Sequence, residues 1–438
     1  MRLRARLPLL SLGFALAVSG LGILRADDWP QWRGTTRDGV WRETGIVEAF
    51  ASKELKPVWV AEVGPGFAGP TVAGDQVFLM DRVAAPEQER VLSFDRTTGK
   101  LRWEHAYPCV YRDVDYAQGP RAAVTVADGR AFSYGTMGHA RAFEAATGRV
   151  LWARDMMADF KTSVNYWGMN SAPLVAGDVV IYHVGGEPDA CLVALDMQTG
   201  KERWRALDGK ASYSPPRLIR VGERDVVLAW TGSWLAGLNP ATGEVLWKEP
   251  HRNTRMIHHV ADPVLDETGR KLVLASFYDG TACFALKTAG GAPEELWHRT
   301  GPNERKTEAI HTISMTPLVR GGYIYGIHSY GELRCLSLET GEKMWDDKTL
   351  QPNERWATAH LVQNGDRTWI STEAGELVIA RLSGKGMEQI SRAKFITPNT
   401  NIIGRNEPVT WAHPAYANRN LYARSDSELV CISLAAEK

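Results

Sequence analysis

The sequence predicts an all-β fold: an eight-bladed β-propeller of four-stranded antiparallel blades, with the ring closed by N- and C-terminal strands. Three observations lead to this prediction. A short phrase ending in tryptophan recurs along the chain, its copies lie 43 to 52 residues apart, and pairs of short apolar strands fill each interval. A repeat of this length, built from short strands and turns, is typical of a propeller blade.

The recurring phrase runs from an apolar strand through a polar residue and a Thr-Gly pair to a tryptophan four residues after the glycine. One copy is VLSFDRTTGKLRW, and full copies end at Trp103, Trp152, Trp204, Trp247 and Trp345. Two degenerate copies also occur. One ends at Trp297, and in the other Ile390 stands where the tryptophan belongs. The glycine suits the positive φ of a tight hairpin, and the polar residue can bond the turn backbone. The tryptophan offers a large apolar face for packing on the next blade.

Strand pairs with glycine-containing turns supply the inner part of each blade. Clear examples cover residues 69–81, 171–185 and 315–328, and five more begin near Arg121, Tyr213, His259, Thr358 and Trp411. The outer strands also number eight if the strand at 57–63, which holds Trp59, pairs with the strand at 428–434. This pairing joins the two ends of the chain and removes two exposed strand edges, as a closed propeller requires.

A small residue stands six positions before the repeat glycine, as in Ser93, Ala142, Ala194, Gly237 and Cys335. Cys431 takes the same place in the last strand. We therefore expect Cys335 and Cys431 to fill a tight slot in the sheet. The chain has five cysteines and no two are adjacent, so the sequence does not indicate a disulfide framework. A single disulfide elsewhere remains compatible with an oxidising compartment.

Composition predicts an ordinary globular chain, with 44% hydrophobic and 23% charged residues and equal numbers of basic and acidic groups. Residues 1–26 are typical of a signal peptide: a basic start, MRLRAR, an apolar run from Leu7 to Leu24, and Ala26 before the cut. The same run is long enough for an uncleaved anchor. Without this leader the chain is weakly acidic, which argues against nucleic acid as a partner.

These features predict three segments: a signal peptide at 1–26, an N-terminal extension at 27–56 and the propeller at 57–438. We expect Trp29 and Trp32 to pack the extension on the propeller. Export to the periplasm or the medium follows from the leader, with no membrane span in the mature chain.

The phrase L-x-x-L-D-x-x-T-G-x-x-x-W resembles the repeat of enzymes that use pyrroloquinoline quinone (PQQ). The stretches DWPQWRGTTRDG (28–39), GPRA (119–122), YWGMNSAPL (166–174) and SYSPP (212–216) resemble bacterial PQQ-binding-like β-propeller repeat proteins. The resemblance covers most of residues 57–434. It implies the fold strongly and the activity weakly, because the repeat residues are scaffold.

Two kinds of relative imply different functions. Quinoprotein alcohol dehydrogenases share the repeat and blade number, but they carry a calcium site, a catalytic aspartate and a disulfide between adjacent cysteines, none of which matches a motif here. The propeller lipoprotein of the outer-membrane β-barrel assembly machine is a non-enzymatic scaffold of more similar length. Its lipid-bearing cysteine has no counterpart near residue 26, since the first cysteine is Cys109.

Blade geometry indicates where a site belongs. In an up-and-down blade the Thr-Gly hairpins share one face with the turns between the first two strands, and the crossings between blades lie on the opposite face, here called the long-loop face. Loops on a rigid scaffold commonly carry binding groups. The candidate funnel residues on these crossings are Arg121, Trp167, Asn170, Tyr213, His258, His259, His311 and Trp411, and Tyr116, Trp356 and His413 lie on the same crossings.

No metal site is predicted, because adjacent strand residues such as His258 and His259 point to opposite faces, and no His-x-His, Cys-x-x-Cys or HExxH spacing occurs. We expect an exported, non-catalytic binding or scaffolding propeller without a cofactor. Its partner would be a protein, peptide or small-molecule ligand at the long-loop face. The alternative is a PQQ-dependent oxidoreductase of alcohols or sugars, with PQQ and calcium as cofactors and unknown catalytic residues.

Overall fold

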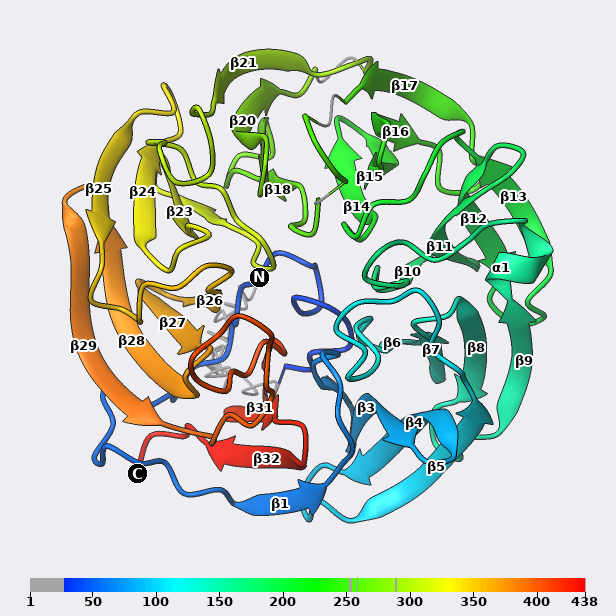
Figure 1. The fold of residues 1–438 in the computed structure, drawn as a ribbon, viewed down its shortest axis with the longest axis horizontal. Coiled ribbons are helices and arrows are strands. Elements are labelled where there is room, and N and C mark those ends of the chain that lie inside the picture. Colours follow the sequence, from blue (N-terminus) through cyan, green and yellow to red (C-terminus); the bar gives the residue numbers. More distant parts are fainter. Residues whose placement is uncertain (1–26, 252–253, 258, 288–289, 438) are drawn as a thin grey trace, which may run out of the picture.

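Eight four-stranded antiparallel sheets stand around a central channel, which confirms the predicted eight-bladed propeller (Figure 1). The structure is a computed structural model and describes residues 27–251, 254–257, 259–287 and 290–437. The predicted signal peptide at 1–26 lies outside the described residues. Among the helices that the structure describes, none is long and apolar enough to span a membrane.

Seven blades are built from four consecutive strands each, ordered from the channel outward. Blade 1 is β2 (Thr71–Ala73), β3 (Gln76–Ala84), β4 (Glu87–Asp95) and β5 (Leu101–Pro108). Blade 2 is β6 (Thr125–Ala127), β7 (Arg130–Tyr134), β8 (His139–Glu144) and β9 (Val150–Asp155), followed by the short helix α1 (Met156–Asp159). Blade 3 is β10 (Leu174–Ala176), β11 (Val179–Gly186), β12 (Ala190–Asp196) and β13 (Glu202–Ala206). Blade 4 is β14 (Arg217–Val221), β15 (Arg224–Trp230), β16 (Trp234–Leu238) and β17 (Val245–Pro250).

The second half of the ring repeats this order. Blade 5 is β18 (Val264–Leu265), β19 (Lys271–Ser276), β20 (Gly280–Ala285) and β21 (Glu294–Arg299). Blade 6 is β22 (Leu318–Arg320), β23 (Tyr323–Ile327), β24 (Leu333–Ser337) and β25 (Lys343–Asp347). Blade 7 is β26 (Ala359–Asn364), β27 (Arg367–Thr372), β28 (Glu376–Ser383) and β29 (Gly386–Lys394).

Blade 8 joins the two ends of the chain, as predicted. It consists of β30 (Ala415–Ala417), β31 (Asn420–Arg424), β32 (Glu428–Ser433) and, on the outside, β1 (Trp59–Glu62). β1 runs antiparallel to β32 with Trp59 opposite Cys431. Because β32 is bonded to strands on both sides, the ring has no open edge at the chain ends.

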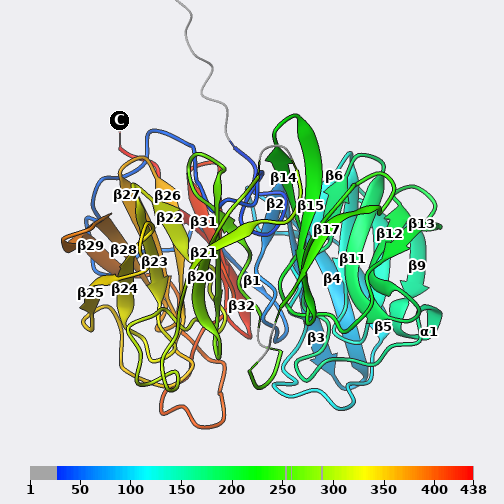
Figure 2. The same ribbon diagram turned by 90° about the horizontal axis from the view of Figure 1, so that it is seen from above.

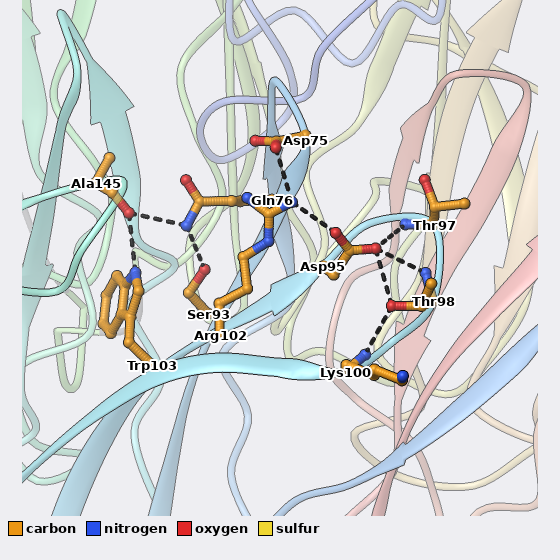
Figure 3. A network of polar contacts seen from close by, with 10 residues as sticks. All are labelled: Asp75, Gln76, Ser93, Asp95, Thr97, Thr98, Lys100, Arg102, Trp103 and Ala145. Atoms are coloured by element: carbon orange, nitrogen blue, oxygen red, sulfur yellow. Dashed lines mark hydrogen bonds and ion pairs between the residues drawn. The ribbon is translucent and has the colours of Figure 1, made fainter.

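The polar residue of the recurring phrase organises its hairpin. In blade 1 the carboxylate of Asp95 accepts the backbone N–H of Thr97 at 3.0 Å and of Thr98 at 2.9 Å (Figure 3). Arg102 donates to Asp95 at 2.6 Å and to Asp75 at 2.7 Å, which ties the hairpin to the neighbouring turn. The same carboxylate-to-backbone bonds recur at Asp196 in blade 3. The phrase is therefore a self-contained turn motif.

The repeat tryptophans of six blades dock onto the next blade by a hydrogen bond as well as by packing. The indole N–H of Trp103 donates to the carbonyl oxygen of Ala145 in blade 2 at 2.9 Å (Figure 3). Equivalent bonds of 2.8–3.1 Å join Trp59 to Arg96, Trp152 to Met197, Trp204 to Pro240, Trp297 to Leu338 and Trp345 to Ser383. These bonds fix the angle between neighbouring blades.

The repeat glycine is needed for two reasons. Gly99 has a φ of 69°, in the left-handed region, and a Cβ added there would lie 2.5 Å from the ring of Trp59 in the preceding blade. The small residue of the phrase faces its own blade's tryptophan across the strands: Cys335 is opposite Trp345 and Cys431 is opposite Trp59. All five cysteines are buried free thiols.

Blade 7 shows one error in the sequence prediction. Ser391, not Ile390, occupies the tryptophan position, because the strand bulge that precedes the tryptophan in other blades takes up Ile390 here. The hydroxyl of Ser391 accepts the backbone N–H of Phe50 at 2.9 Å, and the Phe50 ring packs 5.9 Å from that of Trp369. The N-terminal segment thus covers the blade that has no tryptophan at the repeat position.

Residues 27–56 lie across the hairpin face of the ring and enter the channel mouth (Figures 1 and 2). Single β-bridges connect Trp29 to Val72, Val40 to Gln363 and Ile46 to Ala435. Trp29 and Trp41 are almost fully buried, beside Tyr416. The segment therefore spans the junction between blades 1, 8 and 7.

Replacing the tryptophan of an intact repeat should strongly destabilise the ring. We expect Trp204→Ala to lower the free energy of unfolding by about 3–5 kcal/mol, because it empties a buried site and breaks the bond to Pro240. Denaturant unfolding measures this, with Leu101→Ala at an exposed strand position as the control. A loss below about 1 kcal/mol for Trp204→Ala would contradict inter-blade docking.

Removing the closing strand should open the ring. A chain lacking residues 428–438 loses β32 and with it the pairing partner of both β1 and β31, so we expect no soluble folded protein. A chain lacking only residues 435–438 keeps β32 and serves as the control. Soluble yield and far-UV circular dichroism are the measurements. A truncated protein that melts like the parent would refute closure by joined ends.

Candidate binding pocket

A pocket with a cavity volume of about 150 Å³ opens on the long-loop face at the end of the channel. The longest inter-blade loops extend from this face, which is the lower one in Figure 2. Its walls come from separate crossings, so the closure of the ring brings them together. Lining side chains include Phe67, Tyr116, Arg121, Trp167, Asn170, Tyr213, Trp356, His360, Trp411 and His413, with Trp32 from the N-terminal segment.

Five of the eight predicted funnel residues line this pocket: Arg121, Trp167, Asn170, Tyr213 and Trp411. Their crossings lead into blades 2, 3, 4 and 8, which explains why residues far apart in sequence meet there. The phenolic oxygen of Tyr213 accepts the backbone N–H of Trp167 at 3.1 Å, and their rings lie 5.1 Å apart. Trp411 donates its indole N–H to Glu373 at 2.9 Å.

Tyr116 stands at the centre of the aromatic walls. Its ring makes edge contacts with Trp167, Trp356 and Trp411 at centroid distances of 6.5, 6.2 and 6.0 Å. Tyr116 has a φ of 55° and Trp356 a φ of 66°, both in the left-handed region that non-glycine residues rarely adopt. The surrounding contacts therefore hold two aromatic side chains of the pocket in costly backbone conformations.

Arg121 positions the loop that carries Tyr116. Its guanidinium donates to the carbonyl oxygens of Asp115, Tyr116 and Gly119 at 2.5–3.0 Å. Burial lowers the pKa of Arg121 to about 10, so the group stays charged at neutral pH. Because its donors are used on this loop, Arg121 anchors the Tyr116 loop and does not form an open anion site.

The N-terminal segment closes the floor of the pocket. The indole N–H of Trp32 donates to both carboxylate oxygens of Asp262, at 2.9 and 2.8 Å. Burial raises the pKa of Asp262, while Arg33, Arg37 and Arg217 oppose the rise by favouring its charge. Arg37 also donates to the carbonyl oxygens of Pro216 and Pro173. The segment is thereby bonded to blades 3, 4 and 5 inside the channel.

Two histidines support this floor in neutral form. Burial lowers the pKa of His360 to about 4 and that of His413 to about 3. The ring of Trp32 meets His413 edge-on at 4.2 Å, and His360 Nε2 lies 2.9 Å from the carbonyl oxygen of Trp411. The composition of the crossings did not point to Trp32, Phe67 or His360. For Trp32, the sequence WPQWRG offered a signal of a binding residue, because it places an aromatic side chain next to an arginine in a segment without predicted strands.

The remaining predicted residues do not line the pocket. His259 is fully buried, stacked on Trp230 at 4.2 Å, with Nδ1 3.2 Å from the carbonyl oxygen of Thr231. His311 is also fully buried, and its Nδ1 lies 2.8 Å from the carbonyl oxygen of Phe277. Both rings are held between blades by these contacts instead of pointing into the channel. His258 lies outside the described residues.

The pocket residues do not fit a calcium-quinone cofactor. Calcium takes six to eight oxygen ligands, usually including carboxylates. No aspartate or glutamate is among the described side chains that line the pocket. Asp262, below the floor, accepts the indole N–H of Trp32 and forms an ion pair with Arg33. No step through such a cofactor follows from this geometry.

This geometry defines a class of protein: a closed propeller of tryptophan-docked repeats, with a plugged channel and an aromatic pocket on one face. The chain belongs to the family described as outer membrane protein assembly factor BamB, whose sequence model matches residues 87–347. The predicted likeness to PQQ-like repeat propellers is thereby confirmed.

Similar curated proteins include members of this family and a quinone-dependent dehydrogenase. The outer membrane protein assembly factor BamB of Shewanella oneidensis is 26% identical over 53% of this chain and 58% of its own length, so the match spans little more than half of that relative. The BamB of Burkholderia pseudomallei is 21% identical over 84% of this chain and 90% of its own. A 1-butanol dehydrogenase (quinone) of Thauera butanivorans is 25% identical over 52% and 42%.

The solved structure of BamB from Moraxella catarrhalis superposes with a TM-score of 0.59 and 18% identity, covering 88% of this chain and 99% of that one. At this identity the likeness supports the fold alone.

Acid should destabilise the protein through its buried histidines. The pKa of His360 is about 4 in the fold and near 6.5 when unfolded, so the unfolded chain takes up protons first as the pH falls. We expect stability to be lost between about pH 6.5 and pH 4. In His360→Gln the loss should be smaller. Urea unfolding across this range measures it, with exposed His298→Gln as the control. If the stability of His360→Gln depended equally steeply on pH, His360 would not be a source of the acid sensitivity.

Proposed function

We propose that this chain is an exported, non-catalytic binding propeller that captures an apolar side chain of a partner protein or peptide in the aromatic pocket. The observation that carries the proposal is the pocket itself: aromatic walls, a closed floor and an opening on the long-loop face. Family membership supports a scaffolding role, since the family description and several relatives name outer membrane protein assembly. The leader-like residues 1–26 support a periplasmic location.

The size of the pocket favours a side chain over a cofactor. A cavity of about 150 Å³ holds a group of roughly benzene size, whereas small-molecule sites usually measure about 300–1,000 Å³. The walls are largely apolar, and the guanidinium of Arg121 already donates to carbonyl oxygens of its own loop. A phenylalanine-like or leucine-like side chain of a partner matches both the volume and the chemistry.

Site-specific photo-crosslinking tests the location of the partner. A photoreactive phenylalanine at position 356, beside Tyr116, should give a discrete crosslinked product in the native cell envelope. The same residue at position 201, an exposed lysine on the hairpin face, should not. Adding Arg121→Ala should weaken the crosslink at position 356, because the Tyr116 loop loses its anchor. Equal crosslinking from both faces would contradict the proposal.

A quinone titration tests the alternative function. We expect protein treated with PQQ and Ca²⁺ to show no micromolar binding and no dye-linked oxidation of alcohols or sugars, because the pocket lining offers no carboxylate. Stoichiometric binding together with turnover would replace the scaffold with a quinoprotein oxidoreductase.

A further inference from the structure

We propose that His251, His259 and Asp279 form a binding site for one divalent transition-metal ion between blades 4 and 5. His251 directly follows β17, His259 lies on the crossing to β18, and Asp279 lies in the turn between β19 and β20. One ligand atom from each residue lies within 4.8 Å of the other two. The sequence spacing matches no metal motif, so the fold alone brings these residues together.

The distances are close to those of a formed site. Ligand atoms on one zinc ion sit about 2.0–2.2 Å from the metal, which places them roughly 3.2–3.5 Å from each other. Movements of about 1 Å in the side chains close the present gaps. The two imidazole rings are nearly perpendicular, at 86°, with centroids 4.6 Å apart, so their nitrogens can approach one point without the rings colliding.

His259 is oriented as metal-bound histidines usually are. Its Nδ1 lies 3.2 Å from the carbonyl oxygen of Thr231, and because a carbonyl only accepts, Nδ1 carries the hydrogen. Stacking on Trp230 at 4.2 Å and 11° fixes the plane of the ring. With the hydrogen on Nδ1, the atom that can coordinate a metal is Nε2, which lies 4.0 Å from a carboxylate oxygen of Asp279. A cation placed between these two atoms would bind both of them.

His251 contributes an imidazole nitrogen with an unmet bonding need. Its Nε2 is buried and has no hydrogen-bond partner among the described residues. The ring packs edge-on against Trp230 at 5.2 Å, which holds it beside His259. A buried polar atom without a partner is costly, and metal coordination relieves that cost.

Asp279 is a buried carboxylate held in place by hydrogen bonds, and among the described residues no lysine or arginine pairs with it. The backbone N–H of Thr254 donates to Oδ1 at 3.0 Å, and Ser276 lies 3.3 Å from Oδ2. Among the described ion pairs, its partner is His259 and neither a lysine nor an arginine. Burial of a carboxylate is costly unless it is paired or binds a metal. Two imidazoles and one carboxylate suit a zinc-class ion and leave a coordination position open.

A second cluster in the same molecule serves as a comparison, because its carboxylate already accepts several hydrogen bonds. Glu89 lies near Cys109 and His139, and these three also offer ligand atoms within 4.8 Å of one another. Its carboxylate, however, already accepts from Tyr107 at 2.6 Å, Tyr111 at 2.6 Å and the backbone of Thr136 at 2.9 Å. The Glu89 carboxylate is therefore already stabilised by three donors and has less need of a cation than Asp279, so we assign this cluster a structural role.

Zinc titration of the chelator-treated full chain tests the proposal. Calorimetry should show one Zn²⁺ bound per chain at micromolar affinity or tighter, and Zn²⁺ should raise the melting temperature. His251→Ala should weaken binding at least about tenfold and remove the thermal shift. His251 is half-buried, so this variant is expected to fold, which its melting temperature without metal verifies.

Two further variants keep the result unambiguous. Asp279→Asn retains the shape of the side chain but lowers its charge, and it should also weaken zinc binding. His139→Ala in the cluster around Glu89 should bind zinc as the parent does. Absence of zinc binding by the parent chain overturns the proposal and leaves His259 and Asp279 as an ion pair. Binding that survives in His251→Ala, or is lost in His139→Ala, overturns it equally.

Discussion

The hydrogen bond from a repeat tryptophan to a carbonyl of the next blade is the interaction on which the rest of the structure depends. It orients six of the blades on their neighbours, and the repeat glycine leaves the space that the indole needs. Trp59 makes the same bond to Arg96 from a strand at the start of the chain. One local rule therefore sets both the angle between blades and the closure of the ring.

A closed ring of eight blades leaves a channel, and the chain fills part of it with its own N-terminal segment. Polar groups brought into this channel need partners, and Arg37 finds them in carbonyl oxygens of Pro173 and Pro216, beside the innermost strands. Trp32 does so through Asp262. The N-terminal segment turns an open channel into a pocket with a floor, which is why the pocket opens on the long-loop face.

Sequence reasoning located the face of the pocket and five of its residues, since crossings between blades must converge on the channel. It failed where side-chain direction mattered. His259 and His311 lie at the predicted positions along the chain, but their rings turn between blades because Trp230 and the carbonyl of Phe277 hold them there. Ile390 was misplaced by one residue because a strand bulge shifts the register, and no spacing rule shows a bulge.

The sequence by itself determined the repeat, the number of blades and the joining of the two ends. Each of these follows from short-range chemistry, in which Asp95, Gly99 and Trp103 act within one hairpin and one neighbouring sheet. Only the tertiary structure decided what meets in the channel and between blades 4 and 5. Trp32 and Asp262 are 230 residues apart, and the cluster of His251, His259 and Asp279 spans two blades. Such contacts depend on the curvature of the whole ring, which no local pattern encodes.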